Sequence, residues 1–219
     1  MILTDELFDL SHTLAKDFFP KEDPYLILPS IKEIVYKIAA TLTEGYTEVK
    51  EGVFIADDAK IYPNTTIEAP TIIGHKTEVR PGAFIRGCAI IGDGAVVGNS
   101  TEIKNAIIFD GVQIPHYNYV GDSILGYKSH LGAGAIASNF RLDHKNIALS
   151  YEGEKIDTGL RKMGVLLGDF AEVGCGSVIC PGAIIGKEAM IYPLSRIIGR
   201  IPQGMVFKDG KIKTRRFDK

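Results

Sequence analysis

Four residues in one short stretch of the chain carry side chains that together could move a proton and hold an anion. They are Glu102, Lys104, His116 and Tyr119: a carboxylate, a cation, an imidazole and a phenol. A neutral imidazole can accept a proton near neutral pH, and a carboxylate beside it can orient the ring. A single histidine is more often structural than catalytic, so the set has meaning only if the fold brings its members together.

The element that positions these residues is a repeat with a period of six. Neither an α-helix nor an alternating strand has this period. A hexapeptide repeat predicts a parallel β-helix, in which each six residues form one short side of a three-sided prism around an aliphatic axis. The aliphatic positions form two tracts: Ile55, Ile61, Ile67, Ile73, Val79, Ile85, Ile91, Val97 and Ile103, then Leu167, Val173, Ile179, Ile185, Ile191 and Ile197.

The repeat also predicts where the candidate residues point. Glu102 and Lys104 flank the axial Ile103, so strand alternation directs both away from the axis. His116 lies two hexads, and therefore two sides of the prism, further along the chain. Because a coil has three sides, a position two sides ahead is also one side back on the next coil. We therefore expect Lys104 and His116 to border the same edge of the prism, one coil apart. The step between axial residues falls to five after Ile103 and again after Val120, and such slips occur where side chains are re-aimed.

Composition describes an ordinary soluble chain. Of its 219 residues, 45% are hydrophobic and 24% are charged, with a formal net charge of −2, which gives no global reason to expect nucleic acid as a partner. The charged N-terminus predicts neither a signal peptide nor a membrane span. The odd set Cys88, Cys175 and Cys180 favours free thiols in a reducing compartment. We expect a cytoplasmic protein that binds neither nucleic acid nor a membrane.

The expected organisation is an N-terminal helical cap over residues 1–50, a β-helix over 51–201 and a C-terminal tail over 202–219 that leaves the prism. Within the cap, helices are predicted over 3–16 and 30–42, the second from an apolar stripe of period 3.6. The two helices should form a hairpin that caps the first coil, because the terminal repeats of a solenoid need a cover.

A loop over residues 139–164 is predicted between two coils, because the six-residue register stops there. An alternating run on either side of Glu152 and Gly153 predicts a hairpin within the loop. Long loops that leave a regular solenoid commonly build binding sites.

The run from Val97 to Phe140 resembles the acetyltransferase domain of the bifunctional N-acetylglucosamine-1-phosphate uridyltransferase/glucosamine-1-phosphate acetyltransferase. The resemblance covers about residues 80–201, and the loop ending DTGLRKMGVLLGD is similar to the archaeal sugar-1-phosphate branch. It implies a left-handed β-helix of the hexapeptide-repeat transferases, a homotrimer, and acetyl-CoA and a sugar phosphate meeting between subunits. The matching residues are Glu102 and Lys104 in VGNxxExK, His116 to Asp122 in His-x-x-Tyr-x-Gly-Asp, Gly132 to Gly134, and Asn139.

These matches imply a role for each residue. We expect His116 to be the general base that deprotonates the attacking amine, with Glu102 orienting it and with no covalent intermediate or catalytic metal. Backbone N–H groups at Ala133 and Gly134 are candidates to bind the oxyanion. The expected sugar-phosphate ligands are Arg80 or Arg86, Lys104, Tyr119, His130, Asn139 and Lys145, and the expected coenzyme ligands are Ala133, Gly134, Cys175 and Pro193.

The chain departs from the family pattern at two sites. Arg80 matches an arginine of the family by its motif, RPGA, whereas Arg86 matches it by distance from Lys104, and only one of the two is expected to reach phosphate. His130 stands where bacterial enzymes carry an asparagine, which suggests a different acceptor such as galactosamine 1-phosphate. We expect acetyl transfer alone, since about fifty residues before the repeat could not hold a uridyltransferase domain.

Two other functions are compatible with such a fold. One is a non-catalytic scaffold or regulatory subunit of a sugar-nucleotide enzyme. The other is a γ-class carbonic anhydrase, which needs three histidines around zinc. His75, His116 and His130 are available for that role, but no two histidines have the close spacing that such a site uses.

Overall fold

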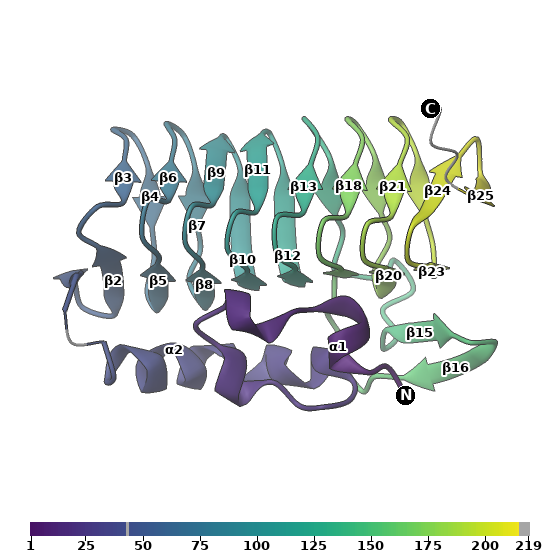
Figure 1. Cartoon of the computed structure of the whole chain (residues 1–219), viewed down its shortest axis with the longest axis horizontal. Coiled ribbons are helices and arrows are strands. Elements are labelled where there is room, and N and C mark those ends of the chain that lie inside the picture. The colour runs from purple at the N-terminus through teal and green to yellow at the C-terminus, as the bar shows by residue number, and fades with distance from the viewer. Residues whose placement is uncertain (43, 215–219) are drawn as a thin grey trace.

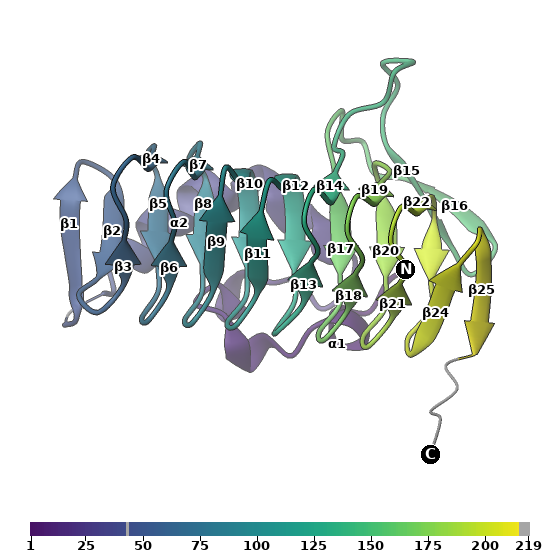
Figure 2. The ribbon, with the colours of Figure 1, turned by 90° about the horizontal axis from the view of Figure 1, so that it is seen from above.

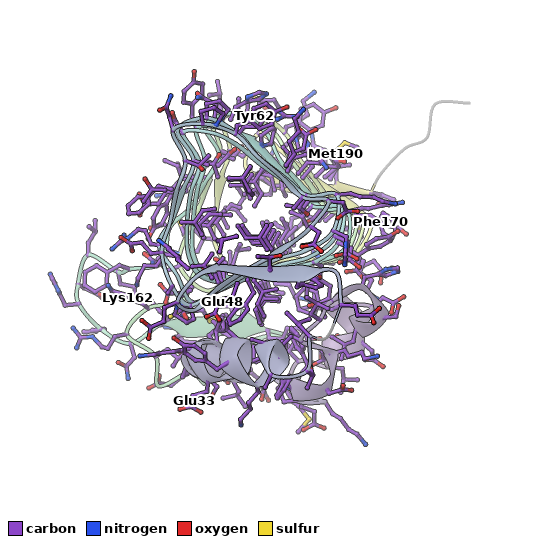
Figure 3. All side chains as sticks on the ribbon, turned by 90° about the vertical axis from the view of Figure 1, so that its left-hand side faces the viewer. Glu33, Glu48, Tyr62, Lys162, Phe170 and Met190 are labelled. Atoms are coloured by element: carbon purple, nitrogen blue, oxygen red, sulfur yellow. The ribbon has the colours of Figure 1, made fainter. Side chains whose placement is uncertain are left out.

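The computed structural model describes residues 1–42 and 44–214, and it is a three-sided parallel β-helix (Figure 1). Figure 3 looks along the axis from the N-terminal end, with the helices below. As it recedes, the chain passes from the bottom side to the corner at Phe170, up past Met190 to the corner at Tyr62, and down the left side. This course is anticlockwise, so the β-helix is left-handed and the predicted fold class is confirmed.

Three stacks of short strands form the faces of the prism. The covered face contains β2 (Val53–Ala56), β5 (Thr71–Ile73), β8 (Ala89–Ile91), the second halves of β10 (Glu102–Ile108) and β12 (Tyr119–Leu125), β17 (Val165–Leu167), β20 (Ala183–Ile185) and β23 (Arg200–Ile201). The loop face contains β4 (Thr66–Ile67), β7 (Phe84–Ile85), the first halves of β10 and β12, β14 (Ile136–Ala137), β19 (Val178–Ile179) and β22 (Arg196–Ile197). The outer face contains β3 (Lys60–Ile61), β6 (Glu78–Val79), β9 (Val96–Asn99), β11 (Gln113–His116), β13 (His130–Leu131), β18 (Glu172–Val173), β21 (Met190–Ile191), β24 (Met205–Lys208) and β25 (Lys211–Thr214).

Each face sends one column of aliphatic side chains to the axis, as the repeat predicts. On the loop face, Ile85 pairs with Ile103 and Ile103 pairs with Val120, and all three side chains are fully buried. Burial of one such side chain contributes about 1.5–3 kcal/mol. The columns therefore hold the coils together along the whole length of the axis.

Both five-residue steps fall at the corner between the loop face and the covered face. Asn105 occupies this corner in β10 and Asp122 occupies it in β12, with left-handed φ angles of 48° and 47°. Because one residue is missing from each hexad, β10 and β12 run around the corner as continuous strands of seven residues. We call this the Asp122 corner.

The N-terminal segment is mostly irregular, and the predicted helix over residues 3–16 is wrong beyond Leu7. Only α1 (Thr4–Leu7) is α-helical there, and 3₁₀ turns follow at Leu10–His12, Lys16–Phe18 and Pro24–Ser30. The reason is that this backbone bonds to the corner between the covered and outer faces. Asp169 donates its N–H to the Leu7 carbonyl and accepts the N–H of Asp9 on its side chain.

The second helix is confirmed as α2 (Ile31–Ala39), with Ile31, Ile34, Val35 and Ile38 buried. Its expected position over the first coil is wrong, because it lies along the covered face against β5, β8 and β10 (Figure 1). The edge of the first coil is covered instead by β1 (Tyr46–Lys50), which pairs antiparallel with β2. None of the helices in the described residues is long and apolar enough to span a bilayer.

The inserted loop contains the predicted hairpin, formed by β15 (Ala148–Tyr151) and β16 (Glu154–Asp157). Figure 2 shows this segment projecting from the side of the prism. The expectation that the chain leaves the prism after residue 201 is wrong, since β24 extends the outer face and β25 folds back on it. Residues 215–219 of the expected tail lie outside the described residues.

Asp169 offers a test of how the N-terminal segment is attached. Its carboxylate accepts the N–H groups of Asp9 and Tyr127 at 2.7 and 2.8 Å and lies 3.5 Å from the Lys187 ammonium. Asp169→Ala should lower the free energy of unfolding by about 2–4 kcal/mol in urea titrations, because two backbone donors lose their acceptor. Asp143→Ala, which removes an exposed loop carboxylate, is the control and should leave the urea midpoint unchanged.

Candidate functional site

A pocket of about 310 Å³ opens on the loop face where the inserted loop leaves the prism. Arg86 and Lys104 enter it from successive coils of the face, since Arg86 follows the axial Ile85 and Lys104 follows Ile103. Figure 3 shows Lys162 on the loop beside this face. The residues that line the pocket are Arg86, Lys104, Tyr119, Asn139, Phe140 and Lys162.

Arg86, not Arg80, is the arginine of this pocket. The Arg86 guanidinium donates to the Glu102 carboxylate at 2.7 Å, and this hydrogen bond raises the pKa of Arg86. Arg80 follows an axial residue of the outer face and lies 3.3 Å from Glu78. The repeat register, and not the local RPGA motif, therefore predicts which arginine reaches the site.

Tyr119 and Asn139 form one hydrogen-bonded pair on the pocket wall. The Asn139 side-chain amide donates to the Tyr119 hydroxyl at 3.1 Å. Burial, followed by the nearby Asp122 carboxylate, raises the pKa of Tyr119, so the phenol remains protonated. Because its oxygen already accepts from Asn139, its own O–H is free to donate into the pocket.

The sequence did not predict a functional role for three residues of this site. Phe140 and Lys162 face each other across an antiparallel bridge at the neck of the loop, and the basic end of the loop was the only signal for Lys162. Asp122 is 6% exposed and lies under the pocket, where its carboxylate accepts from Asn139 and Asn105. The Gly-Asp pair of the motif pointed to this position but not to a role.

The charges of the pocket favour an anion that also carries hydroxyl groups. Arg86, Lys104 and Lys162 bring three cations, against the carboxylates of Glu102 and Asp122. An arginine offers two parallel donors to a phosphate and a lysine offers a point charge. Tyr119 and Asn139 add neutral hydrogen-bonding groups, so the arrangement suits a phosphate ester of a polyol.

A second feature lies at the corner between the outer face and the loop face, which we call the His116 corner. His116, Ala133, Cys175 and Pro193 occupy it in successive coils, joined by backbone hydrogen bonds between Gly134 and His116 and between Gly176 and Ala133. Most of these residues are small, so the corner has an open surface. The predicted coenzyme ligands are thus brought together in one row.

Gly134 cannot be an oxyanion donor as predicted, because its N–H donates to the His116 carbonyl at 2.9 Å. In the part of the chain that the structure describes, the N–H groups of Ala133 and Cys175 have no backbone acceptor. Ala133 therefore remains the candidate donor beside His116.

His116 is held firmly by its backbone, while its ring is exposed. Its N–H donates to the Asn118 side chain, whose own amide donates to the carbonyls of Gly132 and Ala135 at 2.8 and 3.1 Å. Within residues 1–42 and 44–214 the imidazole has no hydrogen-bonding partner. Glu102 bonds to Arg86 and not to His116.

The expectation that Lys104 and His116 border one edge is wrong. His116 pairs with Asn99 at the His116 corner, where the chain enters the loop face. Lys104 pairs with Gly121 beside the Asp122 corner, where the chain leaves that face. The count of hexads correctly associated both residues with the loop face. However, His116 precedes the axial Val120 of that face, whereas Lys104 follows the axial Ile103, so the two lie at opposite edges of the face.

Two predicted ligands lie outside the pocket. His130 is on the outer face, where its ring lies 2.8 Å from the Glu172 carboxylate. Lys145 lines a separate pocket on the projecting loop with Arg141, His144, Lys155 and Arg161. His75 is at the corner between the covered and outer faces, beside Asp58. The three histidines considered for zinc thus occupy different parts of the prism.

Comparisons with known proteins find both sequence relatives and similar solved structures. A family described as the GMPPB C-terminal domain matches residues 67–156. The bifunctional sugar-1-phosphate nucleotidylyltransferase/acetyltransferase of Sulfurisphaera tokodaii is 35% identical over 165 residues, which are 75% of this chain and 41% of that protein. The bifunctional protein GlmU of Methanococcus maripaludis is 35% identical over 161 residues, which are 74% of this chain and 39% of that protein.

Among solved structures, a hexapeptide transferase family protein from Anaplasma phagocytophilum is similar with a TM-score of 0.41 and 17% identity, covering 76% of this chain and 82% of that one. The chain spans about two fifths of the length of the curated relatives named above.

Proposed function

We propose that this chain, which is related by sequence to bifunctional sugar-1-phosphate nucleotidylyltransferase/acetyltransferases, transfers the acetyl group of acetyl-CoA to the amine of an amino-sugar 1-phosphate. The observation that carries the proposal is the pocket on the loop face. Arg86, Lys104 and Lys162 supply the charge for a phosphate, and Tyr119 and Asn139 supply hydrogen bonds for the sugar.

The reaction needs a neutral amine, because an ammonium group has no lone pair with which to attack. In the proposed mechanism, the His116 imidazole accepts the proton as the amine nitrogen bonds to the thioester carbonyl carbon. The carbonyl oxygen becomes an oxyanion, to which the Ala133 N–H donates. The carbon–sulfur bond then breaks, and the CoA sulfur leaves as the thiol with the proton that His116 returns.

Each substrate has its own wall in this proposal. The sugar phosphate lies on the loop face, and acetyl-CoA lies along the His116 corner against Ala133, Cys175 and Pro193. The His116 corner lies near the pocket, because His116 is only three residues before Tyr119. Tyr119 in turn pairs with Glu102 on the preceding coil. An amine in the pocket and a thioester at the corner would therefore meet near His116.

The site is open on one side, and we propose that a second copy of the chain closes it within a homotrimer. Ile136, Val178 and Leu194 are exposed on the loop face and its edge, where a partner would remove them from water. Sedimentation equilibrium should give three times the chain mass, and a monomer at working concentrations would contradict this assembly. The free thiols of Cys88, Cys175 and Cys180 favour a reducing compartment such as the cytoplasm.

The proposal is tested by thiol release from acetyl-CoA with glucosamine 1-phosphate, galactosamine 1-phosphate and the unphosphorylated amino sugars. Turnover should require the phosphate and differ between the two epimers. If neither sugar phosphate supported thiol release, although the protein bound acetyl-CoA, the acceptor would be another amine. If the protein did not bind acetyl-CoA, the alternative function of a non-catalytic scaffold would be favoured.

Gly121 gives a sharper test of where the sugar phosphate binds. A Cβ at this position would lie 2.5 Å from the Tyr119 hydroxyl and 2.6 Å from the Asn139 amide, so Gly121→Ala must displace their hydrogen-bonded pair. We expect the KM for the amino-sugar phosphate to rise about tenfold or more, as for loss of one or two hydrogen bonds, while the KM for acetyl-CoA stays the same. Cys180→Ala, further along the same face, is the matched control. Equal changes in both KM values would contradict this placement.

A further inference from the structure

We infer that Asp122 is a positioning residue of this site, whose buried carboxylate sets the hydrogen-bonding polarity of the pocket and joins it to the inserted loop. This inference rests on the proposed function. Asp122 does not line the pocket. It acts through Asn139 and Lys104, which do.

The shortened hexads explain how a carboxylate comes to lie there. Asn105 and Asp122 each take the place of a regular corner with one left-handed residue. Their side chains meet one above the other, and the Asn105 amide donates to Asp122 Oδ1 at 2.9 Å. Asparagine and aspartate adopt this conformation more readily than most residues. The slip in the repeat therefore places one acceptor group beneath the pocket.

The orientation of Asn139 follows from the chemistry of the carboxylate. An ionised carboxylate only accepts hydrogen bonds, so the NH₂ group of Asn139 must face Asp122 Oδ2. The other N–H of the same amide donates to the Tyr119 hydroxyl. Both donors of Asn139 are then used, which leaves its amide oxygen as an acceptor and the Tyr119 O–H as a donor. Asp122 thus decides which groups in the pocket accept and which donate.

Lys104 is the cation that balances this buried charge. Its ammonium lies 3.9 Å from Asp122 Oδ2, and the Lys104 side chain is 28% exposed. In the described residues, no other cation lies within 4 Å of the Asp122 carboxylate. The carboxylate therefore holds the ammonium at the floor of the pocket while leaving it accessible to a phosphate.

Asp122 and its partner Asn105 connect the pocket to two neighbouring segments. The Asp122 carbonyl accepts the N–H of Gly164 at 2.7 Å, where the loop returns, and the Asn139 carbonyl accepts the N–H of Met163. Asn105 also donates to the Leu28 carbonyl at 3.3 Å in the N-terminal segment. The neck of the loop is thus fixed at the same point as the pocket.

Asp122→Asn tests the inference with almost no change of volume. The amide introduced at position 122 turns an NH₂ group toward Asn105 or Asn139, both of which are donors. We expect the KM for the amino-sugar phosphate to rise about tenfold or more while the KM for acetyl-CoA stays within about twofold, because only one substrate contacts Asn139 and Lys104.

The double variant Asn105→Asp/Asp122→Asn provides the rescue. It exchanges the two side chains, so the amide at position 122 donates to the new carboxylate and its oxygen again accepts from Asn139. The recovery should be partial, with a KM between those of the single variant and the wild type, because the Lys104 ammonium still lacks a carboxylate at position 122. The double variant also carries the test if the single variant fails to fold, because the side-chain amides at positions 122 and 139 again face acceptors, although the Leu28 carbonyl loses its donor at 3.3 Å.

The outcomes separate this inference from the proposed function. An unchanged sugar-phosphate KM in Asp122→Asn, or a double variant that is folded and as impaired as the single one, overturns the role of Asp122 and leaves the acetyl transfer intact. A wild-type protein that acetylates no amino-sugar phosphate overturns the proposed function and, with it, this inference.

Discussion

Replacing His116 with alanine is expected to lower kcat for acetyl transfer by about 10²–10⁴, the usual contribution of a general base. The KM values for both substrates should change little, because the exposed imidazole makes no hydrogen bond or ion pair within the described residues that its removal would disturb. The measurement is thiol release at saturating substrate.

His75→Ala is the matched control for this experiment. His75 also lies at a corner of the prism and near a carboxylate, Asp58, but at a different corner from His116. It should keep wild-type kcat. If His116→Ala retained kcat within a few-fold of wild type, the base would have to be another group.

Arg86→Ala should raise the KM for the amino-sugar phosphate by about tenfold to a hundredfold, because a charged hydrogen bond to phosphate contributes about 1.5–3 kcal/mol. Arg86→Lys should recover only part of the loss, because a lysine cannot offer two parallel donors to phosphate.

Arg80→Ala is the control that distinguishes spacing from motif. Arg80 lies on the outer face beside Glu78, so both KM values should remain at wild-type levels. A larger effect of Arg80→Ala than of Arg86→Ala would reverse the assignment of the phosphate-binding arginine.

The repeat made the β-helix predictable because its period fixes one geometry. Axial positions such as Ile103 and Val120 are buried on their expected face, and the register alone selects Arg86 over Arg80. The hairpin around Glu152 and Gly153 was also predictable, because an alternating pattern pairs locally.

What the sequence could not give are contacts between segments far apart in the chain. Leu7 and Asp9 bond to Asp169, and the His12 carbonyl accepts the N–H of Asp110, so this segment does not continue the predicted helix. The role of Asp122 depends on Asn139 and Asn105, which the fold brings together from different coils and the loop. The Gly134 N–H was misassigned because its acceptor, the His116 carbonyl, is known only from the stacking of coils.

The most direct test of the central claim is a crystal structure with an amino-sugar 1-phosphate and CoA bound. The phosphate is predicted to lie within hydrogen-bonding distance of Arg86 and Lys104, with the amine directed toward His116 and the CoA sulfur beside Ala133. A phosphate bound instead among Arg141, Lys145 and Arg161 on the projecting loop, with the loop-face pocket empty, would contradict the account.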